Sequence, residues 1–364
     1  MPYRLDIPGQ VSVYQLRAIE LVASLVPAGG AMVEVGSLFG RSSWAWGASV
    51  DPSVQVFCLD PWDTNAGVWQ LELRHGVKYG LEQFVALTRD RPNIRPRAGY
   101  SPDSFLDWDL PIDLYYEDAV HTDPVLTRNL DFWTSKLKPN GIVCGDDYRP
   151  RFPDVREGAA RLARRLGRAL VVAENFWCLL PPESEVPKAR DVAREIEAIH
   201  EEAMTSRRQQ GPLISIGPKR RIPTVPESTR PAVNIQVANE SLDPWLVHPS
   251  DGHSPAVSVS IFQAEQPTLS VAEELVPINV AMLAPDIPVN LDVHLPCDQL
   301  DPGTYRAVFG LLDADGRRVE VVSPETRDGV AFTIEAARTT RPQADGTAQG
   351  TAPAPQERNA ASLD

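Results

Sequence analysis

The segment that decides the fold reads Val33-Glu34-Val35-Gly36-Ser37-Leu38-Phe39-Gly40-Arg41-Ser42-Ser43. A short apolar run that contains one acid ends at a glycine, a second glycine follows four residues later, and two serines come next. This order predicts a β-strand, a tight turn and the first turn of a helix. Glycine lets the backbone approach a ligand closely, and free N–H groups at a helix start favour polar or anionic groups. The segment therefore predicts a nucleotide-type cofactor site near the N-terminus.

Helical and strand patterns alternate on both sides of this segment. Helices are expected at 11–26, 42–50, 79–89, 125–137 and 154–166. Strands are expected at 31–35, 54–59, 94–98, 112–116, 142–144, 169–173 and 176–180, with a turn at 138–141. Alternation of this kind predicts an α/β domain with a Rossmann-like, mostly parallel sheet and helices on both faces. We place this domain at residues 1–183.

The remaining chain divides into three parts by composition. Residues 184–230 predict a charged helix followed by a Pro-rich linker. Residues 231–336 show short alternating strands punctuated by Pro, Gly and Asp, which predicts a small all-β sandwich. Residues 337–364 are rich in Ala, Thr, Pro and Gln and are predicted to be disordered. The expected strands of the sandwich are 233–237, 257–261, 289–294, 305–309, 319–322 and 330–334.

Charge and cysteine content restrict the partners and the compartment. The formal net charge is -14, and residues 231–336 hold sixteen Asp and Glu against four Lys and Arg. Such an acidic surface repels phosphate backbones and argues against a nucleic-acid partner. The four cysteines show no metal-binding spacing, which favours a reducing, cytoplasmic location. No apolar run has the length of a membrane span, so no membrane insertion is expected. The oligomeric state stays open, a homo-oligomer included.

Polar residues follow the expected parallel strands, where ligands bind in open α/β sheets. Asp60 lies 24 residues beyond Gly36, close to the spacing at which an acid meets the ribose hydroxyls of a nucleotide. The glycine turn departs from the G-x-G-x-x-G fingerprint of dinucleotide sites because it lacks the second glycine. The residues expected at this edge of the sheet are Glu34, Gly36, Asp60, Tyr100, Ser101, Glu117, Asp118, His121, Asp146 and Asp147.

These motifs carry a family resemblance over about residues 10–182. Glu34-x-Gly36-x-x-x-Gly40-x-Ser42-Ser43, with Asp60-Pro61-Trp62, resembles the cofactor site of class I S-adenosylmethionine-dependent methyltransferases. Asp118-x-x-His121 and the later Gly145-Asp146-Asp147-Tyr148 are similar to the metal-dependent sugar O-methyltransferase branch, which includes macrolide-sugar methyltransferases. The resemblance implies that S-adenosylmethionine is bound by Glu34, Gly36, Gly40, Ser42, Ser43, Asp60, Trp62, Ser101 and Glu117.

Two departures from the family pattern affect this assignment. Asn140 stands where a glycine is common, which is a mild change because Asn tolerates left-handed backbone. The run Glu117-Asp118-Ala119 replaces the usual Asp-Gly, so either Glu117 or Asp118 can face the site. Trp62 can stack on a ring of the ligand or fill the core.

The acids and histidines predict a methyl-transfer chemistry. A sugar hydroxyl is a poor nucleophile, and a hard divalent cation held by oxygens can lower its pKa. Asp118, Asp146 and Asp147 are the expected ligands of Mg²⁺, and Asp118 and His121 are the expected catalytic residues. An imidazole can take the departing proton, although His75 is a second candidate for this base.

The β-sandwich resembles the immunoglobulin-like domains of bacterial polysaccharide-export and glycan-modifying proteins, through 237–241, Trp245, 295–296 and 301–305. By analogy it binds glycan, and a spacer or dimerisation module is an equal alternative. The sequence thus predicts a Mg²⁺-dependent O-methyltransferase acting on a hydroxyl of a sugar, glycan or glycosylated metabolite. The alternatives are a non-catalytic glycan-binding or assembly protein on a methyltransferase scaffold, and a methyltransferase for a small phenolic or catechol acceptor.

Overall fold

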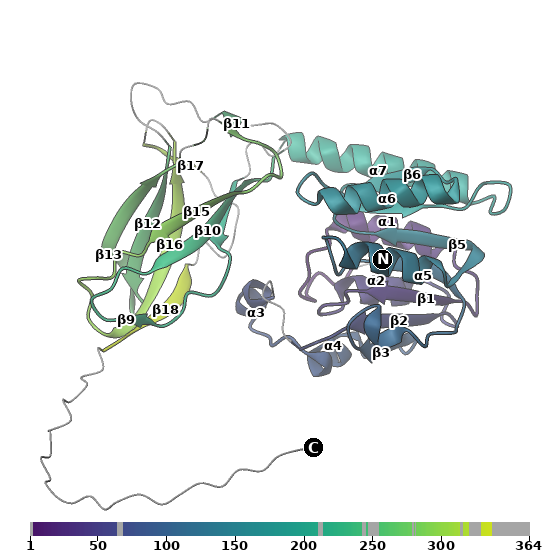
Figure 1. Cartoon of the computed structure of the whole chain (residues 1–364), viewed down its shortest axis with the longest axis horizontal. Helices are drawn as coiled ribbons and strands as arrows, with labels where there is room; N and C mark the ends of the chain where they lie inside the picture. Colours follow the sequence, from purple (N-terminus) through teal and green to yellow (C-terminus); the bar gives the residue numbers. More distant parts are fainter. Residues whose placement is uncertain are drawn as a thin grey trace, which may run out of the picture.

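The computed structural model describes residues 3–63, 68–209, 214–241, 245–246, 255–278, 280, 282–313, 316–319 and 329–336. Figure 1 shows an α/β region built from the first half of the chain and a separate β-rich region built from the second. The predicted tail at 337–364, and the end of the predicted strand 319–322, lie outside the described residues.

The α/β region has a seven-stranded sheet in the order β3-β2-β1-β4-β5-β7-β6. The first five strands in that order are parallel, whereas β7 runs antiparallel to both of its neighbours. This confirms the predicted mostly parallel sheet. The strands are β1 (Ala31–Val35), β2 (Gln55–Asp60), β3 (Ile94–Ala98), β4 (Ile112–Glu117), β5 (Leu137–Gly145), β6 (Leu170–Ala173) and β7 (Phe176–Leu179).

Helices cover both faces of this sheet. Successive residues of a strand point to opposite faces, so they pack in two different hydrophobic cores. Met32 packs in one core with α1, α2 and α7, and Val33 packs in the other with α5 and α6. The amphipathic pattern of each helix therefore decides its face. The helices are α1 (Val13–Ala23), α2 (Arg41–Ser49), α3 (Trp69–His75), α4 (Leu81–Thr88), α5 (Val125–Thr134), α6 (Pro153–Leu166) and α7 (Ala189–Gln209), with a 3₁₀ turn η1 (Asp103–Phe105).

Two local predictions were wrong. The turn expected at 138–141 is part of the continuous strand β5, and the register shifts between Ile112 and Leu114 as β4 pairs with it. The linker expected within 184–230 contains β8 (Ile214–Pro218), which pairs with β10, and β9 (Val225–Pro226), which pairs with β18. Both strands hold prolines at positions where no ladder N–H is needed, so composition masked the strand pattern.

Among the described residues, the β-rich region contains two larger sheets that share one hydrophobic core, and a two-stranded sheet of β11 and β14. A three-stranded sheet has the order β15-β10-β8, and a larger sheet has the order β13-β12-β16-β18-β9 with β17 paired to β16. Buried residues of both sheets, such as Ile235 and Phe309, belong to the same core. The strands are β10 (Ala232–Asn239), β11 (Trp245–Leu246), β12 (Ala256–Gln263), β13 (Gln266–Pro277), β14 (Met282–Leu283), β15 (Val289–His294), β16 (Gly303–Leu312), β17 (Arg318–Val319) and β18 (Val330–Glu335). An immunoglobulin-like topology stays a prediction.

None of the helices within the described part of the chain is both long and apolar enough to cross a membrane.

Candidate active site

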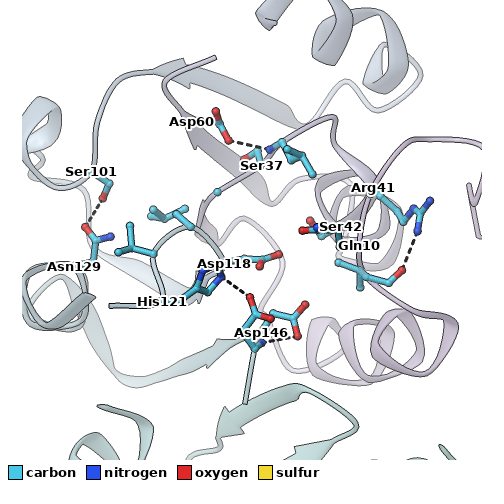
Figure 2. A pocket seen from close by; sticks show the side chains of 18 of the residues that line it. Gln10, Ser37, Arg41, Ser42, Asp60, Ser101, Asp118, His121, Asn129 and Asp146 are labelled. Atoms are coloured by element: carbon cyan, nitrogen blue, oxygen red, sulfur yellow. Dashed lines mark hydrogen bonds and ion pairs between the residues drawn. The ribbon is translucent and has the colours of Figure 1, made fainter. Parts of the chain in front are cut away.

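A cavity of about 510 Å³ lies at the carboxyl ends of the central parallel strands. Figure 2 shows its polar side chains pointing inward from several elements. This is the edge at which ligands bind in open α/β sheets. Of the residues predicted from the sequence, those that line the cavity are Gly36, Ser42, Asp60, Tyr100, Ser101, Asp118, His121, Asp146 and Asp147.

The glycine turn after β1 forms one wall of the cavity. Gly36 has φ +94° and Gly40, the residue before α2, has φ +97°. A Cβ on Gly36 would clash with the carbonyl oxygen of Asp118 and would lie 2.7 Å from the Cα of Ala119. Both conformation and space therefore require glycine at position 36. The turn packs tightly on the loop that follows β4, so it links the predicted cofactor end to the predicted acid cluster.

Asp60 lines the cavity and also holds the glycine turn. Its carboxylate accepts hydrogen bonds from the backbone N–H of Leu38 at 2.9 Å and of Trp62 at 3.0 Å, and from the Tyr79 hydroxyl. Burial raises its pKa above the ordinary value, although these hydrogen bonds oppose the shift. The carboxylate is thus fixed at the place where the sequence predicts ribose contacts.

Glu34, Ser43 and Gly40 lie behind the cavity rather than on its wall. Glu34 is fully buried, and its Oε2 accepts a hydrogen bond from the Ser43 hydroxyl. Among the described residues no hydrogen-bond partner reaches its Oε1, and burial raises its pKa. Gly40 is crowded by Thr88 and Phe84. The structure therefore places these three residues behind the glycine turn, which they support, and their predicted contact with the cofactor stays a prediction.

Trp62 and Glu117 are also placed away from the cavity wall. Trp62 packs in the core with its ring centroid 4.8 Å from that of Phe84, and its indole N–H donates to the Leu38 carbonyl at 2.9 Å. Glu117 accepts from the Tyr115 hydroxyl and from the backbone N–H of Ala119 at 3.1 Å. Burial raises the pKa of Glu117 to about 7. Of the two adjacent acids at the end of β4, Glu117 and Asp118, Asp118 is the one on the cavity wall.

His121 is held between an acid and an aromatic ring. Its Nε2 lies 2.5 Å from Oδ2 of Asp147, and its ring stacks on Phe152 with centroids 4.3 Å apart and planes at 23°. Burial lowers the pKa of His121, but the hydrogen bond and charge of Asp147 outweigh it and the net shift is upward. An imidazole paired in this way has a defined orientation and tautomer. His75, the alternative base, is on α3 and is not among the residues that line the described cavity.

Three carboxyl groups lie close together beside His121. Burial, and then the negative charges of Asp146 and Asp147, hold the pKa of Asp118 well above its usual range. Burial and the charge of Asp147 raise the pKa of Asp146 to about 8. Asp146 accepts hydrogen bonds from the Gln15 side chain and from the backbone N–H of Asp147 at 2.7 Å. The cluster therefore concentrates like charge that neighbouring groups only partly compensate.

The predicted metal site finds no support in this arrangement. Within the described ranges, no group of three or more His, Cys, Asp and Glu side chains is arranged to hold a metal ion. Asp147 is paired with His121, and one oxygen of Asp146 already accepts two hydrogen bonds. The donor set itself, three carboxyls at neighbouring strand ends of which Asp146 is buried and Asp118 and Asp147 are partly exposed, has the chemistry that a hard cation prefers.

Several cavity residues were missed by the sequence interpretation. Asn129 on α5 accepts from the Ser101 hydroxyl at 2.9 Å, and Ser101 in turn accepts from the Trp133 indole at 2.8 Å. The amide nitrogen of Asn129 has no hydrogen-bond partner among the described residues, although Asn129 is fully buried. Nothing in the helical pattern distinguishes Asn129. The other missed residues include Gln10, Tyr79, Arg149, Arg151 and Phe152.

Arg41 was also missed, although it stands inside the quoted turn motif. Its guanidinium donates to the carbonyl oxygens of Ile7 at 2.8 Å and Val11 at 3.1 Å. Arg41 thereby holds the N-terminal segment, including Gln10, against the cavity beside the glycine turn (Figure 2). The sequence feature that could have identified Arg41 as a cavity residue is its place in the turn motif, directly before Ser42.

Residues 33–148 match the family model of a methyltransferase domain. The match begins in β1, includes the glycine turn, Asp60, Asp118 and His121, and ends just after Asp146 and Asp147. This part of the chain is therefore a class I S-adenosylmethionine-dependent methyltransferase domain. A search of curated proteins finds no match to this chain.

Solved structures show low overall similarity. A precorrin-6y C5,15-methyltransferase from Geobacter metallireducens is 16% identical, with 45% of this chain and 77% of that chain covered and a TM-score of 0.33. A methyltransferase from Geobacter sulfurreducens is 17% identical, with 47% and 79% covered and a TM-score of 0.35. The O-methyltransferase NovP is 16% identical, with 48% and 82% covered and a TM-score of 0.35.

Proposed function

We propose that this protein transfers the methyl group of S-adenosylmethionine to a hydroxyl oxygen of a sugar, glycan or glycosylated metabolite. The observation that carries the proposal is the His121–Asp147 pair on the wall of the same cavity as the glycine turn and Asp60. A methyltransferase domain binds the methyl donor. A base that is oriented by a carboxylate suits an acceptor hydroxyl, because the hydroxyl must lose its proton.

The glycine turn and Asp60 are the proposed cofactor end of the cavity. Free backbone N–H groups near the start of α2 favour the polar methionine part of the cofactor. Asp60 would accept hydrogen bonds from the ribose hydroxyls, for which its fixed carboxylate is suited. Ser101 and the unpartnered amide of Asn129 offer further polar contacts on the opposite wall.

His121 is the proposed general base. With the Nε2 proton donated to Asp147, Nδ1 is left to accept the proton of the acceptor hydroxyl. The oxygen then forms a bond to the methyl carbon while the carbon–sulfur bond of the sulfonium breaks. The products are the methyl ether, S-adenosylhomocysteine and a proton on His121. Asp147 stabilises the imidazolium that forms, as a buried carboxylate does for other catalytic histidines.

Mg²⁺ dependence is a separate part of the proposal. Asp118, Asp146 and Asp147 would hold the ion, and a nearby divalent cation would relieve the raised pKa values of Asp118 and Asp146. When bound, the ion would lower the pKa of an acceptor hydroxyl.

The assay that tests the proposal follows S-adenosylhomocysteine release with sugar and catechol panels, each with and without EDTA. Turnover with a sugar supports the proposed acceptor, and turnover confined to catechols overturns it. Loss of turnover in EDTA that Mg²⁺ restores supports the metal, and activity that survives EDTA rejects the three-aspartate ligand set.

The pH dependence of the reaction should follow His121. A base works only when unprotonated, and the pKa of His121 is raised above 6.5 in this structure. We therefore expect kcat/KM to increase with pH through a midpoint above 6.5. The measurement is a kcat/KM profile in EDTA-free buffers of constant ionic strength. In Asp147→Asn the midpoint should move to lower pH, and a midpoint that does not move would contradict the pairing.

Asp146→Asn should stabilise the protein at neutral pH. The folded-state pKa of Asp146 is raised to about 8, so stability is greatest below the unfolded pKa of about 3.9 and is lost as pH rises through about 8. Asparagine keeps the acceptor for Gln15 and the Asp147 N–H, and it removes the cost of protonating the buried carboxyl on folding. We expect Tm to rise by about 2–4 °C, equivalent to about 1 kcal/mol.

Thermal unfolding at pH 5, 7 and 9 checks this prediction, and the gain should be smallest at pH 5. A Tm below that of the wild type at pH 9 would contradict it. Adding Mg²⁺ extends the test, because the ion should raise the Tm of the wild type and leave that of Asp146→Asn nearly unchanged.

A further inference from the structure

The loop between β5 and α6 carries both parts of the proposed base. Asp147 pairs with Nε2 of His121 at 2.5 Å, and Phe152 stacks on the other side of the same ring. Asp147 has φ +62°, a conformation that only a few non-glycine residues adopt. Loop residues 146–152 must therefore keep one conformation if His121 is to keep its orientation.

Within the α/β region, side-chain contacts and backbone hydrogen bonds both hold this loop. Gln15 and the Trp177 indole donate to Asp146, and Tyr148 and Phe152 pack against a hydrophobic core. The Tyr148 N–H donates to the Asn175 carbonyl at 2.8 Å, and the Phe152 N–H donates to the Arg149 carbonyl at 2.9 Å. These bonds fix single points of the loop. The side chain of Arg149, in the middle of the loop, contacts the β-rich region instead.

Arg149 is held by two acids of the β-rich region. Its Nη2 lies 2.5 Å from Oδ1 of Asp286 and 3.1 Å from Oε2 of Glu240. The side chains of Arg149 and Asp286 are only 17% and 8% exposed, so the charges are shielded from water and interact strongly. Arg151 adds a hydrogen bond to Oε1 of Gln236 at 2.5 Å. The same loop residues also line the cavity.

The two acids are themselves held by hydrogen bonds from the β-rich region and from α7. The Asp286 N–H donates to the Asn239 carbonyl at 2.8 Å, and the fully buried Asn239 side chain donates to the Leu283 carbonyl at 2.9 Å. Glu240 accepts from the Ser215 hydroxyl at 2.8 Å, and Arg207 of α7 donates to its backbone carbonyl at 2.6 Å. These hydrogen bonds fix the positions of the two acids that hold Arg149.

We propose that the β-rich region is a working part of the active site, in which Glu240 and Asp286 are positioning residues that hold Arg149 and thus the 146–152 loop around His121. The inference rests on the proposed function. It assigns a role to the second half of the chain that needs no glycan binding. Loss of either acid would leave Arg149 partly uncompensated in a shielded position and release the loop.

The test compares Asp286→Ala and Glu240→Ala with the wild type in the full-length protein. Hydrogen exchange of the amides in 146–152 should become about tenfold faster in both variants. With an acceptor found by the panel, kcat should fall about 10–100-fold, as for a misplaced catalytic group, and the Kd of S-adenosylmethionine should stay the same. Asp286→Asn keeps a hydrogen-bond acceptor for Arg149 and should recover part of the loss. If Asp286→Ala fails to fold, Asp286→Asn and Glu240→Ala carry the test.

The matched control is Glu274→Ala, which removes an ion pair with Arg230 confined to the β-rich region. This variant should match the wild type in loop exchange and in kcat. Loop exchange that is unchanged in Asp286→Ala, or faster exchange with unchanged kcat, overturns the inference. An inactive wild type with faster loop exchange in the variants rejects the proposed function instead, and the two failures are thereby distinguished.

Discussion

His121→Ala should lower kcat by about 10²–10⁴-fold, the usual contribution of a general base. The variant removes the proton acceptor that Asp147 and Phe152 hold in place. The Kd of S-adenosylmethionine should remain nearly unchanged, because the glycine turn and Asp60 form the proposed cofactor end. Steady-state kinetics on the acceptor found by the panel, with calorimetry for the cofactor, measure both quantities.

The control for this variant is His75→Ala, which removes the alternative base. His75 lies on α3 and does not contribute to the described cavity wall. We expect its kcat to match that of the wild type. Unchanged turnover in His121→Ala, or a large loss in His75→Ala alone, would transfer the role to His75.

Gly36→Ala should abolish detectable cofactor binding and lower the stability of the α/β region. The new Cβ would meet the Asp118 carbonyl oxygen and lie 2.7 Å from the Cα of Ala119. The backbone at φ +94° adds the cost of a left-handed conformation, about 1 kcal/mol, and the clash adds about 1–3 kcal/mol. The strain falls where the turn meets the loop that carries Asp118 and His121. Calorimetry and thermal unfolding measure the two effects.

Gly29→Ala is the matched control for Gly36→Ala. Gly29 has φ +70°, yet a Cβ there would have no heavy atom within 4 Å among those described. This variant therefore carries the conformational cost without the clash, and its cofactor affinity should equal that of the wild type. Equal losses in the two variants would show that the close approach at Gly36 has no part in binding.

Much of the α/β fold could be predicted because its signals are local and repeated. The strand Ala31–Val35 and the glycine turn, for example, follow from a short apolar run and two glycines. The turn expected at 138–141 was wrong because Pro139, Asn140 and Gly141 usually interrupt a strand. Here the sheet continues through them and adjusts its register near Ile112. Long-range pairing overrode local preference.

The candidate site was predictable in position but less so in the direction of its side chains. Strand ends placed Asp60, Asp118 and His121 at one cavity. Local sequence did not reveal that Glu34 and Glu117 turn inward to buried hydroxyls. The contacts of Arg149 with Asp286 join residues 137 positions apart, and no local pattern can carry such information. These pairings arise only when the two regions pack together.

Titration calorimetry of the wild-type protein with S-adenosylmethionine tests most directly whether the cavity at the glycine turn binds this cofactor. We expect saturable binding of one cofactor per chain, with a Kd below about 1 mM, the upper end of common substrate affinities. Absence of binding at millimolar cofactor, from a protein shown to be folded, would contradict it.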